Sequence, residues 1–201
     1  MHIVIPINSR YLVAKYHMQD QLINRLKNEV LSLITDRLCA DRRVSRLTVF
    51  SDMHIDYLKR ISRKVHILEN NGDLNDNPSN VISDFLTCND HDDAVFVFYN
   101  PLFPFVSLNS ISYAYTSVIN KSAKSAIGSY YPLKETIVSI EDALEHDNGI
   151  FSVIDKDEFN KSNSRVSDRT RIVGLTALEL ICLRTEADLD LYNLVVNSGM
   201  M

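Results

Sequence analysis

A run of apolar residues from Ala94 to Tyr99 lies near the middle of this 201-residue chain. A run with no polar face predicts a strand at the centre of a sheet that is covered on both sides. Shorter apolar runs at residues 2–5, 47–50 and 65–68 predict three more buried strands. Apolar residues also recur at helical spacing from residue 18 to residue 38. This alternation favours an α/β fold of three layers, with a mainly parallel sheet and helices on both faces.

The rest of the sequence continues the alternation. We expect strands around residues 125–129, 137, 150–154, 172 and 178–183, and helices through 52–61, 81–86, 111–119, from 155 onwards and 186–196. No repeat, linker or low-complexity tract interrupts the pattern, so we expect a single domain over residues 1–201. Within it, the strands at residues 3–5 and 94–99 should be adjacent and central.

Composition narrows the class of partner. A formal charge of −5 and a pI near 5.6 argue against a nucleic-acid surface. No run approaches the roughly 18 apolar residues of a membrane helix, and the first residues do not resemble a secretory leader. Three cysteines without metal spacing suit free thiols in a reducing compartment. We therefore expect a cytoplasmic protein that binds neither nucleic acid nor membrane.

Polar groups follow four of the predicted strands, where ligands of a parallel sheet bind. These groups are Asn8, Arg10 and Lys15 after the first strand, Ser51 after the second, Asn100 after the fourth, and Arg184 after the last. The first five are expected to converge on one cleft. The two cations of the first loop could neutralise a triphosphate. That loop contains no glycine, so it is neither a P-loop nor a dinucleotide fingerprint.

The order of these segments resembles the cytidylyltransferases that make CMP-sialic acid and CMP-Kdo. Family members open with I-P-A-R and a basic loop, where this chain has IPINSR at residues 5–10. Their V-x-T-D-x-x-x-I is similar to VFSDMHI at 49–55, and their Q-P-T-S-P-L-R to NPLFPFV at 100–106. N-G-A-I-Y resembles NGIF at 148–151, and the closing D-I-D-T-x-x-D-L resembles CLRTEADL at 182–189. The resemblance runs in order over nearly the whole chain.

The resemblance implies the fold of nucleotide-diphospho-sugar transferases, which is GT-A-like. It implies transfer of CMP from CTP to an acidic sugar of the sialic acid or Kdo type, in surface-polysaccharide synthesis. It also implies a nucleotide site formed by Asn8, Arg10, Lys15, Ser51, Asn100 and Arg184. In that site the first two cations would hold the phosphates, and Asn100 would lie near the base or ribose. A homo-oligomer or a pathway partner is compatible with this picture.

The chain departs from the family where the reaction needs a divalent metal. Hard Mg²⁺ prefers oxygen ligands, but Cys182 and Arg184 stand where the family has aspartates. Asn8 and Val106 replace family arginines, and Asp188 is expected to be a first-turn helix carboxylate. We therefore assign neither a catalytic residue nor a metal ligand, and a role for Mg²⁺ is doubtful. Two hypotheses remain: an active cytidylyltransferase, or an inactive relative that binds a nucleotide and regulates or contacts a partner.

Several of these residues also have ordinary structural interpretations. Arg10 and Lys15 fit surface cations near a strand end as well as they fit phosphate ligands. Asp52 follows a strand and precedes a predicted helix, which favours an N-cap. Phe103 and Phe105 could line a base pocket. We do not expect Asp52, His54 and Asp56 to form a metal site, because residues two apart on a helix do not face each other.

Overall fold

The computed structural model of the chain describes residues 1–70, 78–88, 93–130 and 136–199. Its strands are β1 (His2–Ile7), β2 (Arg46–Ser51), β3 (Val65–Glu69), β4 (Val95–Tyr99), β5 (Ser125–Ser129), β6 (Thr136–Val138), β7 (Phe151–Asp155) and β8 (Thr170–Gly174). The α-helices are α1 (Ser9–Tyr16), α2 (Asp20–Arg25), α3 (Leu31–Ala40), α4 (Pro78–Cys88), α5 (Leu108–Ile119), α6 (Ile140–His146), α7 (Lys156–Ser162) and α8 (Glu186–Asn197). A π-helical turn, η1 (Leu26–Val30), joins α2 to α3, and a 3₁₀ turn, η2 (Asp56–Arg60), precedes β3.

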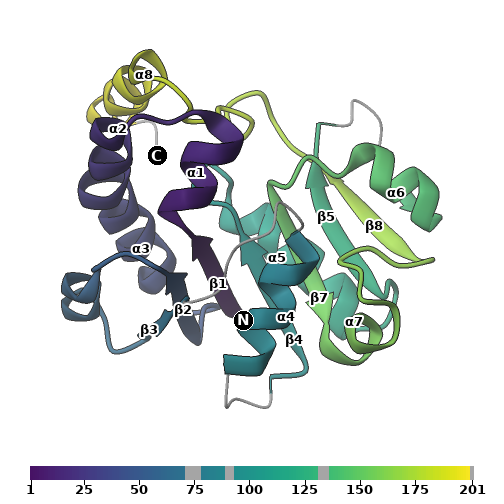
Figure 1. Ribbon diagram of the computed structural model, residues 1–201. Helices are drawn as coiled ribbons and strands as arrows, with labels where there is room; N and C mark the ends of the chain where they lie inside the picture. Colours follow the sequence, from purple (N-terminus) through teal and green to yellow (C-terminus); the bar gives the residue numbers. More distant parts are fainter. Residues whose placement is uncertain (71–77, 89–92, 131–135, 200–201) are drawn as a thin grey trace.

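The strands form one sheet in the order β3-β2-β1-β4-β7-β5-β8-β6 (Figure 1). The pairs β1–β2, β2–β3, β1–β4 and β5–β8 are parallel. Strand β7 is antiparallel to both of its neighbours, and β6 is antiparallel to β8. Ile3 lies opposite Val97, so β1 and β4 are adjacent near the middle of the sheet. The prediction of a mainly parallel sheet with these two strands adjacent is confirmed.

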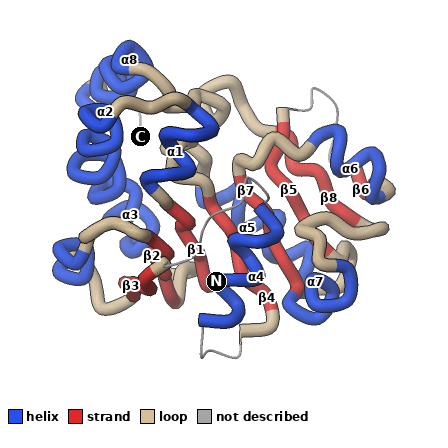
Figure 2. Tube along the Cα trace, viewed as in Figure 1, coloured by secondary structure: helices blue, strands red, loops and turns tan. Residues whose placement is uncertain are grey.

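Alternate residues of the strands divide the core into two layers. Val97 and Tyr99 of β4 pack with α3, α5 and α8 on one face, whereas Phe96 and Phe98 pack with α4 and α7 on the other. Helix α6 covers the same face as α4 and α7, at the far end of the sheet. This is the arrangement expected for a strand without a polar side, and Figure 2 shows helices in front of and behind the sheet.

Three local predictions are wrong. The helix expected through residues 52–61 is only the 3₁₀ turn η2. The segment after β1, expected to be an open phosphate loop, is the helix α1. Asn8 caps it by accepting a hydrogen bond from the Tyr11 amide, and without a glycine nothing in the segment favours an open loop. The strand expected at residues 178–183 is a turn followed by irregular chain. It pairs with no strand, because β6 already occupies the free edge of β8.

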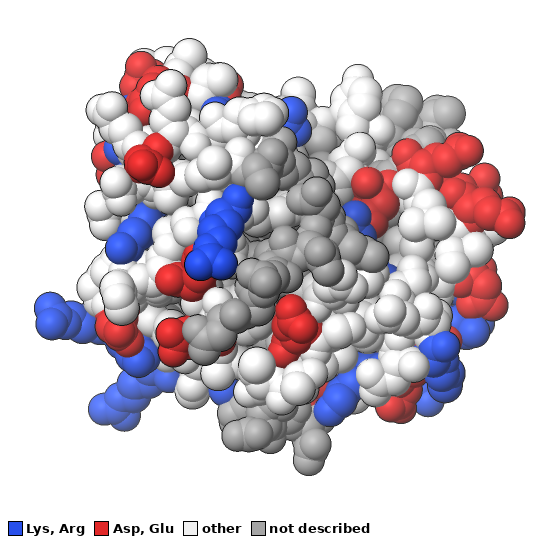
Figure 3. Space-filling view, in the orientation of Figure 1, with Lys and Arg blue, Asp and Glu red and all other residues white. Residues whose placement is uncertain are grey.

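Charged side chains of both signs lie on the surface, with two local groups. On the face shown in Figure 3, acidic side chains gather on the right over α6, which carries the exposed residues Glu141, Asp142 and Glu145. Basic side chains project at the lower left, the end of the molecule where η2 and β3 lie. No helix among the described residues is long and apolar enough to cross a membrane. On this face, α6 therefore forms an acidic patch.

Candidate functional site

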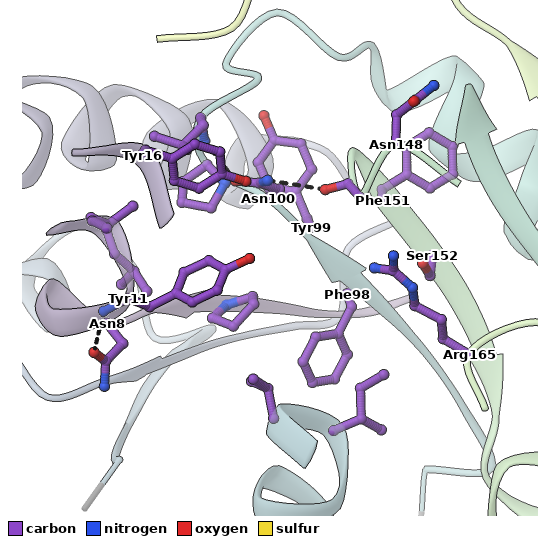
Figure 4. Close-up of a pocket in the computed structure, with 18 of the residues that line it drawn as sticks. Asn8, Tyr11, Tyr16, Phe98, Tyr99, Asn100, Asn148, Phe151, Ser152 and Arg165 are labelled. Carbon is purple, nitrogen blue, oxygen red and sulfur yellow. Dashed lines mark hydrogen bonds between the residues drawn. The ribbon is translucent and has the colours of Figure 1, made fainter. Parts of the chain in front are cut away.

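A cavity of about 270 Å³ lies at the carboxyl ends of β1 and β4 (Figure 4). In the strand order, the chain leaves β1 for β2 on one side, and β4 pairs with β1 on the other. Such a switch point is where open α/β sheets bind their ligands. Asn8 follows β1 and Asn100 follows β4, and both line this cavity. The structure thus brings together two of the polar residues predicted to share a cleft.

Asn100 anchors the cavity wall through both ends of its amide. Its Nδ2 donates to the Gly149 carbonyl at 3.0 Å, and its Oδ1 accepts from the Leu102 amide at 3.0 Å. Gly149 has a φ of 67°, a left-handed conformation that favours glycine. Because Asn100 is held from both sides, it fixes the end of β4 against the turn that precedes β7.

Arg184 also lines the cavity, at the side formed by α1. Its guanidinium stacks on the Tyr16 ring at 5.4 Å, and its Nε donates to the Cys182 Sγ at 3.3 Å. Burial raises the pKa of the Cys182 thiol, although the neighbouring Arg184 opposes this shift. The stacked guanidinium keeps its charge at the cavity and has terminal nitrogens to offer an anion.

Asp188 belongs to a helix cap rather than to a metal centre. Its carboxylate accepts from the Thr185 hydroxyl at 2.8 Å, from the Thr185 amide at 2.8 Å and from the Arg184 amide at 3.0 Å. With Thr185 as N-cap it completes a capping box at the start of α8. Burial alone would raise its pKa, but these hydrogen bonds together lower it. The expectation of a first-turn carboxylate is confirmed.

The opposite wall carries an arginine that no sequence pattern singles out. Arg165 comes from the segment between α7 and β8, and its Nε forms an ion pair with Asp147. The Asp147 side chain is 3% exposed and that of Arg165 is 20% exposed. Figure 4 shows Arg165 reaching into the cavity near Ser152 and facing Tyr11. Neither arginine nor aspartate lies in a recognisable motif, so only the fold could identify them.

Apolar and aromatic side chains make up much of the remaining cavity wall. Phe98 lies beside Val81 and Ile82 of α4 at one wall, and Tyr11 reaches in from α1. A base or sugar ring could pack against such a surface. Phe103 and Phe105, which we expected to be wall candidates, are core residues instead. The prediction failed because both side chains are buried in the main core, where Phe105 packs against Tyr192 of α8.

Two of the other predicted site residues, Arg10 and Ser51, do not line this cavity. Arg10 lines a separate hollow on the far side of α1, together with Lys27 and His54. Ser51 is buried, and its hydroxyl accepts from the Met53 amide at 3.0 Å. The side chain of Lys15 lies outside the described residues. The expected single cleft is therefore split, because the helix that replaced the loop turns Arg10 away from Asn100.

Asp52 has a structural role that differs from the expected N-cap of its own helix. Its carboxylate accepts from the Ser9 amide at 2.9 Å and from the Ser9 hydroxyl at 2.7 Å. Ser9 is the first residue of α1, so Asp52 stabilises the start of a helix distant in sequence. The 3₁₀ turn that follows β2 begins only at Asp56.

The residues present do not suit a divalent cation. Asp147 is engaged by Arg165 and by the Gly149 amide, and Asp188 is engaged by its capping box. Among the residues that the structure describes, no three His, Cys, Asp or Glu side chains come together as metal ligands. The described carboxylates therefore offer Mg²⁺ no set of protein ligands, and an ion bound here would depend on phosphate oxygens and water.

Comparison with known proteins shows which solved structures share this fold. No protein-family model matches the chain, and no curated protein matches it in sequence. Solved structures do match. The 4-diphosphocytidyl-2C-methyl-D-erythritol synthase of Anaerococcus prevotii is 12% identical, with a TM-score of 0.60 over 98% of this chain and 95% of that chain. The 2-C-methyl-D-erythritol 4-phosphate cytidylyltransferase of Francisella tularensis is also 12% identical, with a TM-score of 0.63 over 96% of this chain and 98% of that one.

A further 4-diphosphocytidyl-2C-methyl-D-erythritol synthase gives the same TM-score of 0.63 at 9% identity, and covers 97% of this chain and 98% of that chain. All three likenesses extend over nearly the full length of both chains. At this level of identity they show the fold, which is that of the nucleotidyltransferases expected from the sequence resemblance.

Proposed function

We propose that this protein binds a cytidine nucleotide in the cavity between β1 and β4. The observation that carries the proposal is the convergence of Asn8, Asn100 and Arg184 on one cavity at the switch point of a nucleotidyltransferase fold. The volume of about 270 Å³ lies near the lower end of the range for small-molecule sites, roughly 300–1,000 Å³. It suits a nucleoside with its phosphates at the rim.

Each part of the nucleotide has a matching surface. The wall made by Phe98, Val81 and Tyr11 offers apolar and aromatic area for a ring. Arg184 presents a fixed cation on the α1 side, where we place the phosphate chain. Arg10 has no part in this scheme, because it lines the other side of α1. The cytosine base is proposed from the printed names of the structural neighbours and from the sequence resemblance.

A nucleotide held in this way would need no divalent metal. In metal-dependent transfer, the ion neutralises phosphate charge at the reacting centre. Here a guanidinium takes that place, since an arginine fork matches phosphate oxygens and stays charged at all physiological pH values. We therefore assign the protein a binding role, as a nucleotide-dependent regulator or interaction partner, with its fold retained and its metal ligands lost.

A second candidate is transfer of CMP from CTP to an acidic sugar of the sialic acid or Kdo type. The cytidylyl transfer, but not the acidic acceptor, is favoured by the structural neighbours, which are named as cytidylyltransferases or cytidyl-product synthases and match over nearly their full length. The acidic acceptor rests on the sequence resemblance alone. The reaction would join the α-phosphorus of CTP to an oxygen of the acceptor and release pyrophosphate. The donor set at this edge of the sheet argues against a metal-assisted form of it.

Calorimetric titration separates these candidates. We expect CTP to bind with the same affinity in Mg²⁺ and in EDTA, and CTP with sialic or Kdo-type acids to release no pyrophosphate above background. Strong Mg²⁺-dependent turnover would reject the binding role and establish the transferase. Absence of any CTP or CMP binding would reject both.

A further inference from the structure

Arg165 has binding capacity that the proposed nucleotide does not use. Its Nε is engaged by Asp147, whereas neither terminal nitrogen has a hydrogen-bond partner among the described residues. The side chain is 20% exposed and lines the enclosed cavity rather than the outer surface. A guanidinium with both terminal nitrogens open is suited to bidentate binding of an oxyanion.

Asp147 holds this guanidinium in place. Its carboxylate is 3% exposed, pairs with Arg165 and accepts from the Gly149 amide at 3.0 Å. The pair therefore fixes the orientation of Arg165 before any ligand arrives, which lowers the entropy lost on binding. Asn148, which also lines the cavity, donates from Nδ2 to the Ser129 hydroxyl at 3.2 Å, so the turn that carries Asp147 is tied to β5 as well.

The position of Arg165 separates it from the phosphates of the nucleotide. Figure 4 shows Tyr16, on which Arg184 stacks, and Arg165 on opposite sides of the cavity. One phosphate chain that leaves past Arg184 would move away from Arg165. Ser152 lies beside Arg165 in Figure 4 and adds a hydroxyl to this wall, and Asn148 is a further polar residue that lines the cavity.

We infer that Arg165 forms a second anion subsite in the cavity, which binds a phosphate or carboxylate of a molecule other than the nucleotide. Asp147 is its positioning residue. The inference rests on the proposed function only for the identity of the first ligand, because anion binding can be measured with no nucleotide present. The second ligand is thus a small molecule with an exposed oxyanion, small enough to share the cavity with a nucleoside.

The test uses inorganic phosphate as the probe and calorimetry as the readout, since the chain has no tryptophan to report binding by fluorescence. Phosphate should bind to the protein alone, and saturating CMP should not prevent this binding. Arg165→Gln should weaken phosphate binding at least tenfold and leave the affinities for cytidine, CMP and CTP unchanged. Asp147→Asn should weaken phosphate binding to a smaller degree. Acetate should be held by the same residue, as a carboxylate probe.

The matched control is Arg42→Gln, which removes the same charge from an exposed residue outside the cavity. It should leave phosphate binding unchanged. Arg165→Lys replaces the glutamine variant if that variant unfolds, with folding checked by circular dichroism. The lysine keeps the charge but lacks the guanidinium fork, so we expect clearly weaker phosphate binding.

Competition between phosphate and CMP would overturn the inference, because Arg165 would then hold the nucleotide's own phosphate. Phosphate binding that survives Arg165→Gln would overturn it too. Phosphate binding lost in this variant, in a protein that binds no nucleotide, would uphold the subsite and reject the proposed function.

Discussion

Arg184 shows how one residue can serve both structure and ligand. Its backbone amide supports the α8 cap, and its side chain stacks on Tyr16 at the cavity. In a low-dielectric cleft, a charge fixed by stacking interacts more strongly with a phosphate than one free in water. Its contribution should grow with the number of phosphates that lie beyond the nucleoside.

The first prediction follows from this geometry. Arg184→Ala should weaken CTP binding by about tenfold, a loss of about 1.4 kcal/mol, and should weaken CMP binding less. The β- and γ-phosphates of CTP would lose a charged partner that CMP scarcely uses. Calorimetry with both nucleotides measures the difference, and Arg42→Ala is the control. An equal loss for CTP and CMP would mean that Arg184 acts on the nucleoside or on the fold.

Glu179 is a second residue whose role only the fold defines. Its buried carboxylate accepts from the Ser107 amide at 2.9 Å, the Ser110 hydroxyl at 2.7 Å, and the amide and hydroxyl of Thr176, both at 2.9 Å. Burial alone would raise its pKa, but these four hydrogen bonds together lower it. The ionised form ties the segment after β8 to the first turn of α5.

This pKa shift predicts a pH dependence of stability. A lowered pKa means that the folded state favours the carboxylate, so the stabilisation is present above the ordinary pKa of about 4.3 and is lost as the pH falls below it. Glu179→Gln should lower the free energy of unfolding at neutral pH by about 1–3 kcal/mol. Urea unfolding at pH 7 and pH 4 measures both effects. An unchanged difference between the two pH values in the variant would assign the acid sensitivity to other groups.

At the scale of elements, the segment after β1 decides the shape of the site. As the helix α1, it presents Asn8, Tyr11 and Tyr16 to the cavity and Arg10 to the hollow behind. Successive residues of a helix point in different directions, so the polar residues of one loop motif cannot all face one ligand. The antiparallel strand β7 closes the other side and carries Phe151 and Ser152 to the cavity.

Strand β5 limits how the cavity wall can move. A methyl group at Gly128 would overlap the ring of Phe151, which lines the cavity. Gly128→Ala should therefore destabilise the protein by about 1–3 kcal/mol and weaken nucleotide binding as the ring is displaced. Urea unfolding and calorimetry measure the two effects. Full stability and affinity in Gly128→Ala would show that Phe151 can shift freely.

At the scale of the whole molecule, the eight described strands belong to one sheet. Strands β4 and β7 connect the parallel group that contains β1 to the group that contains β5 and β8, and a continuous core runs under both groups. We propose that residues 1–201 fold as a single cooperative domain. Elements that share a core are expected to lose their structure together.

Unfolding experiments test the single domain. Far-ultraviolet circular dichroism and tyrosine fluorescence should give coincident urea transitions with one midpoint. The nine tyrosines are spread from α1 to α8, so their signal reports on both groups of strands. Two separated transitions would show that the β6 end of the sheet unfolds independently of the β1 end.

The sequence alone determined the architecture. Apolar runs such as Ala94–Tyr99 can be buried only between two layers of helices, so the central strand, its neighbour β1 and the mainly parallel sheet could be predicted. It also indicated which strand ends carry polar groups, and Asn8, Asn100 and Arg184 do line one cavity. For Asn8 and Asn100 the prediction depends on the common edge at which parallel strands end. Arg184 reaches the cavity although the strand expected before it did not form.

The tertiary structure decided the rest. Arg10 lies outside the cavity because residues 9–16 form the helix α1 rather than a loop. The Asn8 cap and the Asp52 carboxylate, which follows β2, stabilise the start of this helix. Residues 178–183 did not form a strand, because Glu179 bonds to α5 and β6 occupies the available edge. Arg165 and Asp147 are 18 residues apart in sequence and meet at the cavity only in the folded sheet, where β7 and β8 pair with their neighbours. Contacts between residues far apart in the chain depend on which elements compete for the same packing partners. The outcome of that competition cannot be predicted from the local pattern of a single sequence.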